Sequence, residues 1–214
     1  MTPSGSSPRV IVLGGGGHAR VVLDAVRSAG TQVHGFVDRD PAARLADLPH
    51  LGDDAVVLAM DVDDVLLVNG LGSLTSTSAR RDLYDRFAAA GFRHAAVVHP
   101  AAVIADDTVI DSGAQIMAGA VVQTGAHIGV NVIVNTRASV DHDTVIGDHA
   151  HVAPGAVVCG GVKIGPGVHV GAGAVVVQGI SIGANALLMA GAVVVDDVPE
   201  GACVAGVPAR ERTT

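Results

Sequence analysis

The stretch from Ile104 to Val193 divides into fifteen consecutive blocks of six residues: IADDTV IDSGAQ IMAGAV VQTGAH IGVNVI VNTRAS VDHDTV IGDHAH VAPGAV VCGGVK IGPGVH VGAGAV VVQGIS IGANAL LMAGAV. The first residue of every block is a branched aliphatic, and the fifth is small or β-branched. A six-residue period without a break is typical of a parallel β-helix built from hexapeptide repeats.

The physical basis of this period is the alternation of side chains along a strand. The fifth residue of one block and the first of the next are two positions apart, so both point inward, while the sixth points outward. Nine of the fifteen fourth residues are Gly, two are Asn and two are Asp, which tolerate positive φ at a corner. Three blocks form one triangular coil, so residues 18 apart stack roughly 4.8 Å apart in adjacent coils. The sequence therefore predicts a prism of five coils.

The composition limits the classes of function. The chain has 214 residues and a net charge of −8, which argues against a nucleic-acid partner. Since it has neither an 18-residue apolar run nor a signal peptide, we expect a cytoplasmic protein without a membrane partner. Cys159 and Cys203 form no metal or redox motif, and we expect buried thiols. Residues 1–8 are rich in Ser, Pro and Gly and are predicted to be disordered.

The segment before the prism has the pattern of a small α/β domain. A short apolar strand at Arg9–Leu13 leads into four glycines, and a helical pattern from Arg20 to Ala29 follows. Further elements are predicted as strands at Val33–Val37, Val65–Val68 and Ala95–Val98 and a helix at Thr77–Ala90. We therefore predict a Rossmann-like β-α-β-α-β domain over residues 9–98.

The glycine loop of this domain fits a phosphate-binding fingerprint. Gly14, Gly16 and Ala19 match G-x-G-x-x-G/A, and an acidic residue, Asp38, follows about 20 residues later. Ligands of open α/β sheets bind at the carboxyl ends of the strands. We expect a substrate-binding set to converge there: Gly16, Gly17, His18, Asp38 and Gly70. The alternative is a tight structural turn; about 95 residues are too few for the six-stranded sheet that holds a full dinucleotide.

The prism departs from its own pattern at one place. The fourth-position column is Gly, Asn or Asp except at Arg137 and His149, and the block between them contains Asp141-His142-Asp143. An irregularity in a regular array indicates a site. His142 occupies a corner, where its imidazole points outward and Asp143 can orient it and raise its basicity.

Gly160 lies 18 residues after His142 and is therefore expected one coil further in the same column. The missing side chain allows a ligand to approach and leaves a backbone N–H accessible. His142 and Gly160 together are therefore a candidate catalytic pair.

One outward column of the prism is almost entirely valine. This valine face consists of Val121, Ser139, Val157, Val175 and Val193. An exposed apolar stripe usually marks a protein interface, and a three-sided prism favours a closed cyclic trimer. We therefore predict a homotrimer through the Val121/Val157/Val175/Val193 face, with His142 at the interface.

A metal site is the main alternative use of the histidines. His151 and His169 stack in one outward column, and His127 lies on another face. Neutral imidazoles gathered at a trimer interface can bind zinc, as in carbonic-anhydrase-like hexapeptide proteins. The sequence shows no clear set of three histidines, so we expect no metal.

The chain resembles the sugar acetyltransferases of the sialic acid O-acetyltransferase family. The resemblance rests on residues 14–18, His99-Pro100, the unbroken hexads, residues 140–147, residues 149–152 and Gly206-Val-Pro-Ala209. Within the family, it is most similar to nucleotide-sugar N-acetyltransferases that act on 4-amino-4,6-dideoxy sugars, including the UDP-bacillosamine and GDP-perosamine enzymes.

The resemblance implies a left-handed β-helix over residues 99–195, a trimer, acetyl-CoA bound between neighbouring prisms, and a C-terminal tail at 196–214 near CoA. His142 would be the catalytic base, Asp143 would tune it, and the Gly160 N–H would stabilise the oxyanion. The implied acetyl-CoA contacts are His151, Gly160, Ala172, Ala190, Gly206, Pro208 and Arg210. The glycine-loop set would hold the nucleotide.

The resemblance implies a reaction as well as a fold. We expect acetylation of the 4-amino group of a nucleotide-linked 4-amino-4,6-dideoxy sugar, for a surface polysaccharide such as lipopolysaccharide O-antigen. Two alternatives stay open: O-acetylation of sialic acid or another sugar, and a trimeric metal-dependent protein similar to carbonic anhydrase. The sequence names neither the nucleotide base nor the sugar.

Overall fold

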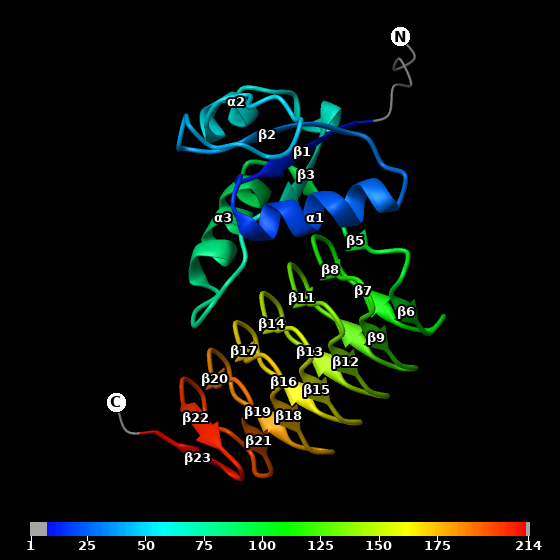
Figure 1. The fold of residues 1–214 in the computed structure, drawn as a ribbon, viewed down its shortest axis with the longest axis vertical. Helices are drawn as coiled ribbons and strands as arrows, with labels where there is room; N and C mark the ends of the chain where they lie inside the picture. Colours follow the sequence, from blue (N-terminus) through cyan, green and yellow to red (C-terminus); the bar gives the residue numbers. More distant parts are fainter. Residues whose placement is uncertain (1–7, 213–214) are drawn as a thin grey trace.

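The computed structural model describes residues 8–212, so the predicted disorder falls almost wholly outside the described residues. The chain forms an α/β domain at one end and a triangular prism at the other (Figure 1). Within the described range, no helix is both long enough and apolar enough to cross a bilayer.

The N-terminal domain is built on a four-stranded sheet in the order β2-β1-β3-β4, and β1 pairs in parallel with both β2 and β3. Its strands are β1 (Arg9–Leu13), β2 (Val33–Val37), β3 (Val65–Asn69) and β4 (Arg93–His94), and its helices are α1 (Gly17–Ser28), α2 (Asp54–Leu58), the 3-10 turn η1 (Val62–Asp64) and α3 (Ser78–Ala89). The parallel order places the ends of β1, β2 and β3 at one edge, where the glycine loop lies.

The prism is a left-handed parallel β-helix with three sheets. The hexads predict the three-sided prism, and the family resemblance implies its hand. The five-stranded sheet holds β7 (Val109–Ile110), β10 (His127–Ile128), β13 (Val145–Ile146), β16 (Lys163–Ile164) and β19 (Ser181–Ile182). The eight-stranded sheet holds β5 (Val97–Val98), β8 (Gln115–Ile116), β11 (Ile133–Val134), β14 (His151–Val152), β17 (His169–Val170), β20 (Leu187–Leu188), β22 (Cys203–Gly206) and β23 (Ala209–Glu211). The six-stranded sheet, which carries the valine face, holds β6 (Val103–Ile104), β9 (Val121–Val122), β12 (Ser139–Val140), β15 (Val157–Val158), β18 (Val175–Val176) and β21 (Val193–Val194).

The register of the sheets confirms the 18-residue stacking. His127 pairs with Val145, and His151 pairs with His169. One inward column consists of Ile116, Val134, Val152, Val170 and Leu188, and each is fully buried. Because a buried aliphatic side chain contributes roughly 1.5–3 kcal/mol, such columns hold the prism without any aromatic residue in its core cluster.

The prediction that Ala95–Val98 forms the last strand of the N-terminal domain was wrong. The sheet of the N-terminal domain ends with the two-residue strand β4, which pairs with β3. Val97 and Val98 instead form β5, which pairs with β8 as the first strand of the prism. An apolar run carries no information about which neighbour it will pair with, so the sequence pattern could not separate the two strands.

The N-terminal domain packs on the eight-stranded sheet of the prism, beside β5, β8, β11 and β14 (Figure 1). The outward residues of that sheet are consequently buried: Gln115 and Ile133 completely, and His151 and His169 to 4% and 6% exposure. The six-stranded sheet remains open by comparison, with Val157 of the valine face 38% exposed and Val103 on the neighbouring strand β6 64% exposed.

Candidate functional site: the His142 corner

The His142 corner is the column of turns between the six-stranded and five-stranded sheets, and His142 itself lies in the turn from β12 to β13. Asp143 follows with a φ of 56°, a left-handed conformation in which its carboxylate reaches the imidazole. His142 Nδ1 lies 2.9 Å from Asp143 Oδ2. This hydrogen bond, with a smaller contribution from the charges of Asp141 and Asp143, raises the pKa of His142 above its usual value. Nδ1 is thereby the donor, and Nε2 is left as the basic atom.

Gly160 lies directly beneath the imidazole, in the next turn of the same column. A Cβ atom on Gly160 would be 2.5 Å from His142 Nε2, far inside van der Waals contact. Only glycine therefore permits the observed position of the ring. The Gly160 N–H donates no hydrogen bond to any residue from 8 to 212, although its carbonyl accepts one from the Gly179 N–H.

The predicted CoA-groove residues lie on a different column of turns, between the eight-stranded and six-stranded sheets. We call this column the Ala172 corner, because Ala172 and Ala190 both lie on it, and both are exposed. At both corners that border the valine face, several glycines have open space beside the backbone. A Cβ atom would meet nothing within 4 Å at Gly155, Gly161, Gly173, Gly179 and Gly191. A single chain does not bring the two corners together, since one side of the prism separates them.

The C-terminal residues of the predicted set lie beyond the last coil. Gly206, Pro208 and Arg210 belong to the antiparallel β22–β23 hairpin and are exposed. Arg210 Nη1 lies 3.4 Å from Asp196 Oδ2. This hairpin closes the end of the eight-stranded sheet, again away from His142.

His151 is not at the His142 corner. It lies in the eight-stranded sheet beneath the loop that holds Ser73, with Nδ1 2.6 Å from Ser73 Oγ and Nε2 3.0 Å from Asn135 Nδ2. Asn135 Oδ1 already accepts the Thr136 N–H, so its Nδ2 donates to Nε2 and His151 Nδ1 donates to Ser73. Burial, with the nearby charges of His169, His18 and Arg80, lowers the pKa of His151 to about 3. His151 is therefore neutral at physiological pH.

The glycine loop brings most of the predicted nucleotide-binding residues together. Gly16 is the N-cap of α1 and provides no side-chain cap, and neither Gly16 nor Gly17 has an atom within 4 Å of where a Cβ would lie. The start of α1 therefore has open space beside it and no side-chain cap, which leaves room for an anion. Asp38 accepts hydrogen bonds from the N–H groups of Gly15 and Asp40, at 2.7 and 2.9 Å. Its carboxylate thus holds the loop in shape.

Gly70 and His18 connect this loop to the rest of the molecule. Gly70 is buried, and a Cβ there would be 2.7 Å from the carbonyl oxygen of Leu13, so its small size serves close packing. His18 Nε2 lies 2.8 Å from Gln115 Oε1 on β8. Because Gln115 Nε2 donates to the carbonyl of Asn69, its Oε1 must accept, so His18 donates through Nε2. Burial, together with the charge of Arg80, lowers the pKa of His18 to about 4.

Arg80 is a structurally important residue that the sequence pattern did not reveal. It is 1% exposed, and its guanidinium donates to the carbonyl oxygens of Asn69, Leu71 and Asn131. Burial lowers its pKa to about 9. Arg80 thereby joins the loop after β3 to the prism. No pattern in the sequence indicated this role, because it depends on the contact between the two domains.

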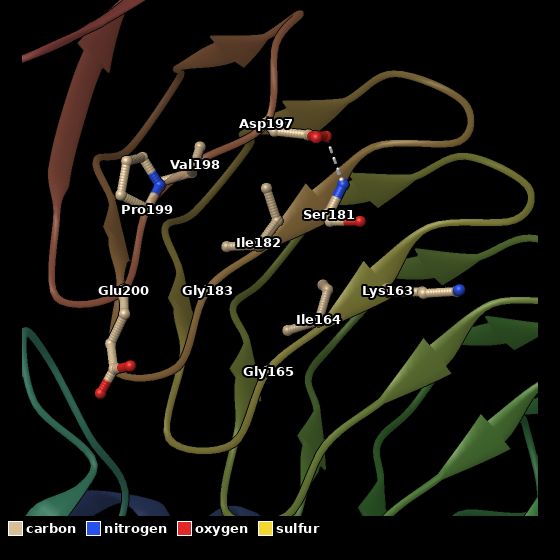
Figure 2. A pocket seen from close by; sticks show the side chains of 10 residues that line it. All are labelled: Lys163, Ile164, Gly165, Ser181, Ile182, Gly183, Asp197, Val198, Pro199 and Glu200. Atoms are coloured by element: carbon tan, nitrogen blue, oxygen red, sulfur yellow. Dashed lines mark hydrogen bonds between the residues drawn. The ribbon is translucent and has the colours of Figure 1, made fainter.

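Two cavities lie away from the His142 corner. One of about 440 Å³ adjoins the glycine loop and is lined by Gly14, Val37, Asp38, Arg39, Asp54, Leu71, Ala79, Asp82, Leu83 and Arg86. Inside it, Asp54 pairs with Arg86. The other, of about 540 Å³, is an open groove near the last coils (Figure 2). It is lined by Lys163, Ile164, Gly165, Ser181, Ile182, Gly183, Asp197, Val198, Pro199 and Glu200. The first cavity shares Gly14 and Asp38 with the glycine loop, although Gly16, Gly17 and His18 do not line it.

The histidines do not assemble into a metal centre within residues 8–212, where no three His, Cys, Asp or Glu side chains come together as ligands. His151 and His169 do lie side by side, with ring centroids 4.9 Å apart. Ser73 Oγ lies within hydrogen-bond distance of Nδ1 on both rings. Both Nδ1 atoms therefore have the Ser73 hydroxyl as their hydrogen-bond partner.

Both the N-terminal domain and the prism match known protein families. Residues 9–87 match the PglD N-terminal domain, and residues 143–178 match the hexapeptide repeats of bacterial transferases. No curated protein sequence matches the chain significantly. The prism and these matches place the chain among the hexapeptide-repeat transferases.

Solved structures give the more particular assignment. The acetyltransferase domain of PglB from Neisseria gonorrhoeae, in complex with acetyl coenzyme A, is 32% identical with a TM-score of 0.90, covering 97% of this chain and 100% of that one. PerB from Caulobacter crescentus, in complex with CoA and GDP-perosamine, is 33% identical with a TM-score of 0.89, over 97% and 99%. WeeI from Acinetobacter baumannii is 26% identical with a TM-score of 0.86, over 96% and 100%. The chain belongs to this family of sugar N-acetyltransferases with a PglD-type N-terminal domain.

Proposed function

We propose that this protein transfers the acetyl group of acetyl-CoA to the 4-amino group of a nucleotide-linked 4-amino-4,6-dideoxy sugar. The observation that carries the proposal is the His142 corner, where a carboxylate-oriented imidazole lies directly over a glycine with a free N–H. The similarity to structures with bound acetyl-CoA and GDP-perosamine supports both substrates. Surface polysaccharide such as O-antigen is the expected destination of the acetylated sugar.

His142 acts as the catalytic base in this proposal. The sugar amine must be neutral to attack the thioester carbonyl, so a base removes its proton before or during the addition. Nε2 is the free nitrogen of the ring, because Nδ1 donates to Asp143. Asp143 also stabilises the imidazolium that forms when the proton arrives, so it tunes the base without accepting the proton itself.

The Gly160 N–H is the proposed oxyanion donor. Attack on the thioester creates a negative oxygen, and a preorganised N–H beside the base stabilises it without reorganisation. When the tetrahedral intermediate collapses, the C–S bond breaks and CoA leaves as a thiolate, which takes the proton from the imidazolium. Gly160 therefore serves twice, because its lack of a side chain also makes room for the base.

The CoA site requires a second copy of the chain. Ala172 and Ala190 lie on the corner across the valine face from His142. A trimer with the valine faces toward its axis brings the Ala172 corner of one copy beside the His142 corner of the next. The exposed valines support this assembly, since such an apolar stripe usually marks an interface. We place the CoA arm between these corners, with the tail residues Gly206, Pro208 and Arg210 of the neighbour as further contacts. His151 is left out of this set, because the residue is 4% exposed and both of its ring nitrogens are bonded to Ser73 and Asn135.

The nucleotide is proposed to bind at the glycine loop. Its diphosphate would lie at the N-terminus of α1 beside Gly16, Gly17 and His18, where the helix dipole favours an anion. Asp38 supports the loop, and Gly70 allows the two loops to pack closely. Since acetyl-CoA and nucleotide sugars are cytoplasmic metabolites, we expect the reaction to occur in the cytoplasm.

Thermal stabilisation by ligands tests the proposal. A ligand at a hundred times its Kd adds about 2.7 kcal/mol to the folded state. We expect stabilisation by acetyl-CoA and by one of UDP, GDP and dTDP. Stabilisation by acetyl-CoA alone would favour O-acetylation of a free sugar, and no response to any of them would refute the acetyltransferase proposal.

A further inference from the structure

Arg137 is an exception in the Ala172 corner. The fourth residues of this column are Gly119, Arg137, Gly155, Gly173 and Gly191, and all have positive φ. At Arg137 φ is 56°, a conformation that a side chain with a Cβ adopts at a cost. Strain that persists in a native structure points to a function. Replacement by glycine, the residue found elsewhere in the column, would remove the strain.

The Arg137 guanidinium is a free cation on the single chain. Its aliphatic part lies over Gly119, where a Cβ would be 3.2 Å from Arg137 Cγ. The side chain is exposed, and it forms no hydrogen bond or ion pair with any residue in the range 8–212. The packing of its stem holds the charge at the edge of the valine face.

Asp141 lies at the opposite edge of the same face and at the same level along the prism. Arg137 is two residues before Ser139, the outward residue of β12, and Asp141 is two residues after it. One oxygen of Asp141 accepts the His142 N–H at 2.8 Å, and its carboxylate forms no ion pair within the same described range. The two edges of the valine face thus carry opposite charges at matched positions.

We propose that Arg137 of one copy forms an ion pair with Asp141 of the next copy in the trimer, beside His142. This inference rests on the trimeric site proposed above. A cyclic trimer whose axis runs parallel to the prism keeps equivalent coils level, and with valine faces inward it places each Arg137 edge against the neighbour's Asp141 edge. Charge complementarity of this kind fixes the register of an interface. Arg137 therefore acts as a positioning residue for the catalytic corner.

The proposed ion pair between Arg137 and Asp141 also changes the pKa of His142, which a purely structural contact would not do. The charged groups along the His142 corner are Asp141 and Asp143 in its own turn, Asp106 and Asp107 two coils earlier, and Asp196 and Asp197 three coils later. Asp141 adds to the raised pKa of His142, after the hydrogen bond from Asp143. A guanidinium on Asp141 offsets that contribution. Its removal should raise the pKa of His142 further, so the acidic limb of the rate profile should move to higher pH.

The test uses Arg137→Gly in the full-length chain, with Asn185→Gly as its matched control. Asn185 has a φ of 57° on a corner that does not border the valine face. Both variants relieve backbone strain, so neither should impair folding. We expect Arg137→Gly to dissociate at about tenfold higher protein concentration, measured by analytical ultracentrifugation. The acidic limb of kcat/KM should move up by as much as about one pH unit.

Charge-reversal variants test the ion pair between Arg137 and Asp141 more directly. Arg137→Asp should assemble less well than Arg137→Gly, because two acidic edges would face each other, and Arg137→Asp combined with Asp141→Arg should recover assembly. If the unaltered chain is an active trimer and Arg137→Gly matches it in both assembly and pH profile, the ion pair is refuted alone. If the unaltered chain is active as a monomer, both the trimeric site and the ion pair are refuted.

Discussion

The histidines of this protein fall into two groups with opposite environments. His142 lies on an exposed corner, where Asp143 raises its pKa. His151 and His18 lie where the N-terminal domain meets the eight-stranded sheet, and burial there lowers their pKa values to about 3 and 4. The same side chain is thus a proposed base in one place and a neutral hydrogen-bonding link in the other. Surroundings, and not residue type, decide which histidine can take a proton at neutral pH.

The largest expected effect comes from removing the exposed base. His142→Asn should lower kcat by roughly 10²–10⁴, because proton removal from the amine loses its positioned acceptor. Release of the CoA thiol measures the rate, and circular dichroism should show an unchanged fold. A loss of only a few-fold would mean that the amine arrives already deprotonated and that His142 only positions it.

A smaller but more specific effect is expected at the glycine beneath the ring. Gly160→Ala would place a Cβ 2.5 Å from His142 Nε2 and so displace the imidazole. A misplacement on the order of 1 Å can cost about 10²-fold in rate. Gln178→Ala, one coil further along the same corner, is the control and should retain activity. Equal activity in both variants would contradict the role of Gly160.

The burial of His18 and His151 predicts how the free energy of unfolding depends on pH. The folded-state pKa values of His18 and His151 are lower than the unfolded value of 6.5, so the unfolded chain binds more protons between about pH 6.5 and 3. Their contribution is present above pH 6.5 and is lost as the pH falls through that window. One pKa unit corresponds to about 1.4 kcal/mol, so each could contribute on the order of 3 kcal/mol. Urea unfolding at pH 7.5, 6 and 5 measures this loss.

Two variants separate the groups in that experiment. His142→Asn should leave the pH dependence of stability almost unchanged, since His142 is exposed. His151→Gln should make it shallower, because a neutral amide replaces one of the depressed histidines. A slope that is identical in the unaltered chain and in His151→Gln would show that burial of this histidine does not control acid stability.

The smallest expected effect concerns the loop over the eight-stranded sheet. Ser73→Ala removes the hydroxyl that accepts from His151 Nδ1 and leaves a buried donor without a partner. Such a loss costs about 1–3 kcal/mol. Ser76→Ala, at an exposed position of the same loop, is the control. An unchanged urea midpoint in Ser73→Ala would mean that the loop is not held by this hydrogen bond.

The sequence predicted the exposed site far better than the buried one, for a physical reason. A repeat of fixed period is nearly one-dimensional, so the position of Gly160 one coil beyond His142 follows from counting 18 residues. The adjacency of His142 and Asp143 likewise needs no tertiary information. The roles assigned to these residues stay predictions, although the geometry brings them together.

Docking of the N-terminal domain follows no such period. His151 and His169 were expected on an outward face, and nothing in the hexads revealed that the loop with Ser73 would cover them. The separation of β4 at Arg93–His94 from β5 at Val97–Val98 was missed for the same reason, because partner choice depends on distant segments. The sequence pattern located the valine face. The packing of a second copy of the chain against that face stays a proposal.

The most direct test of the central claim is product analysis after incubation with acetyl-CoA and nucleotide-linked 4-amino-4,6-dideoxy sugars. We predict release of CoA thiol together with a singly acetylated nucleotide sugar whose new bond is an amide, resistant to mild base. Mass spectrometry before and after base treatment distinguishes it from an ester. An ester product, acetylation only of free sugars, or no transfer at all would contradict the account.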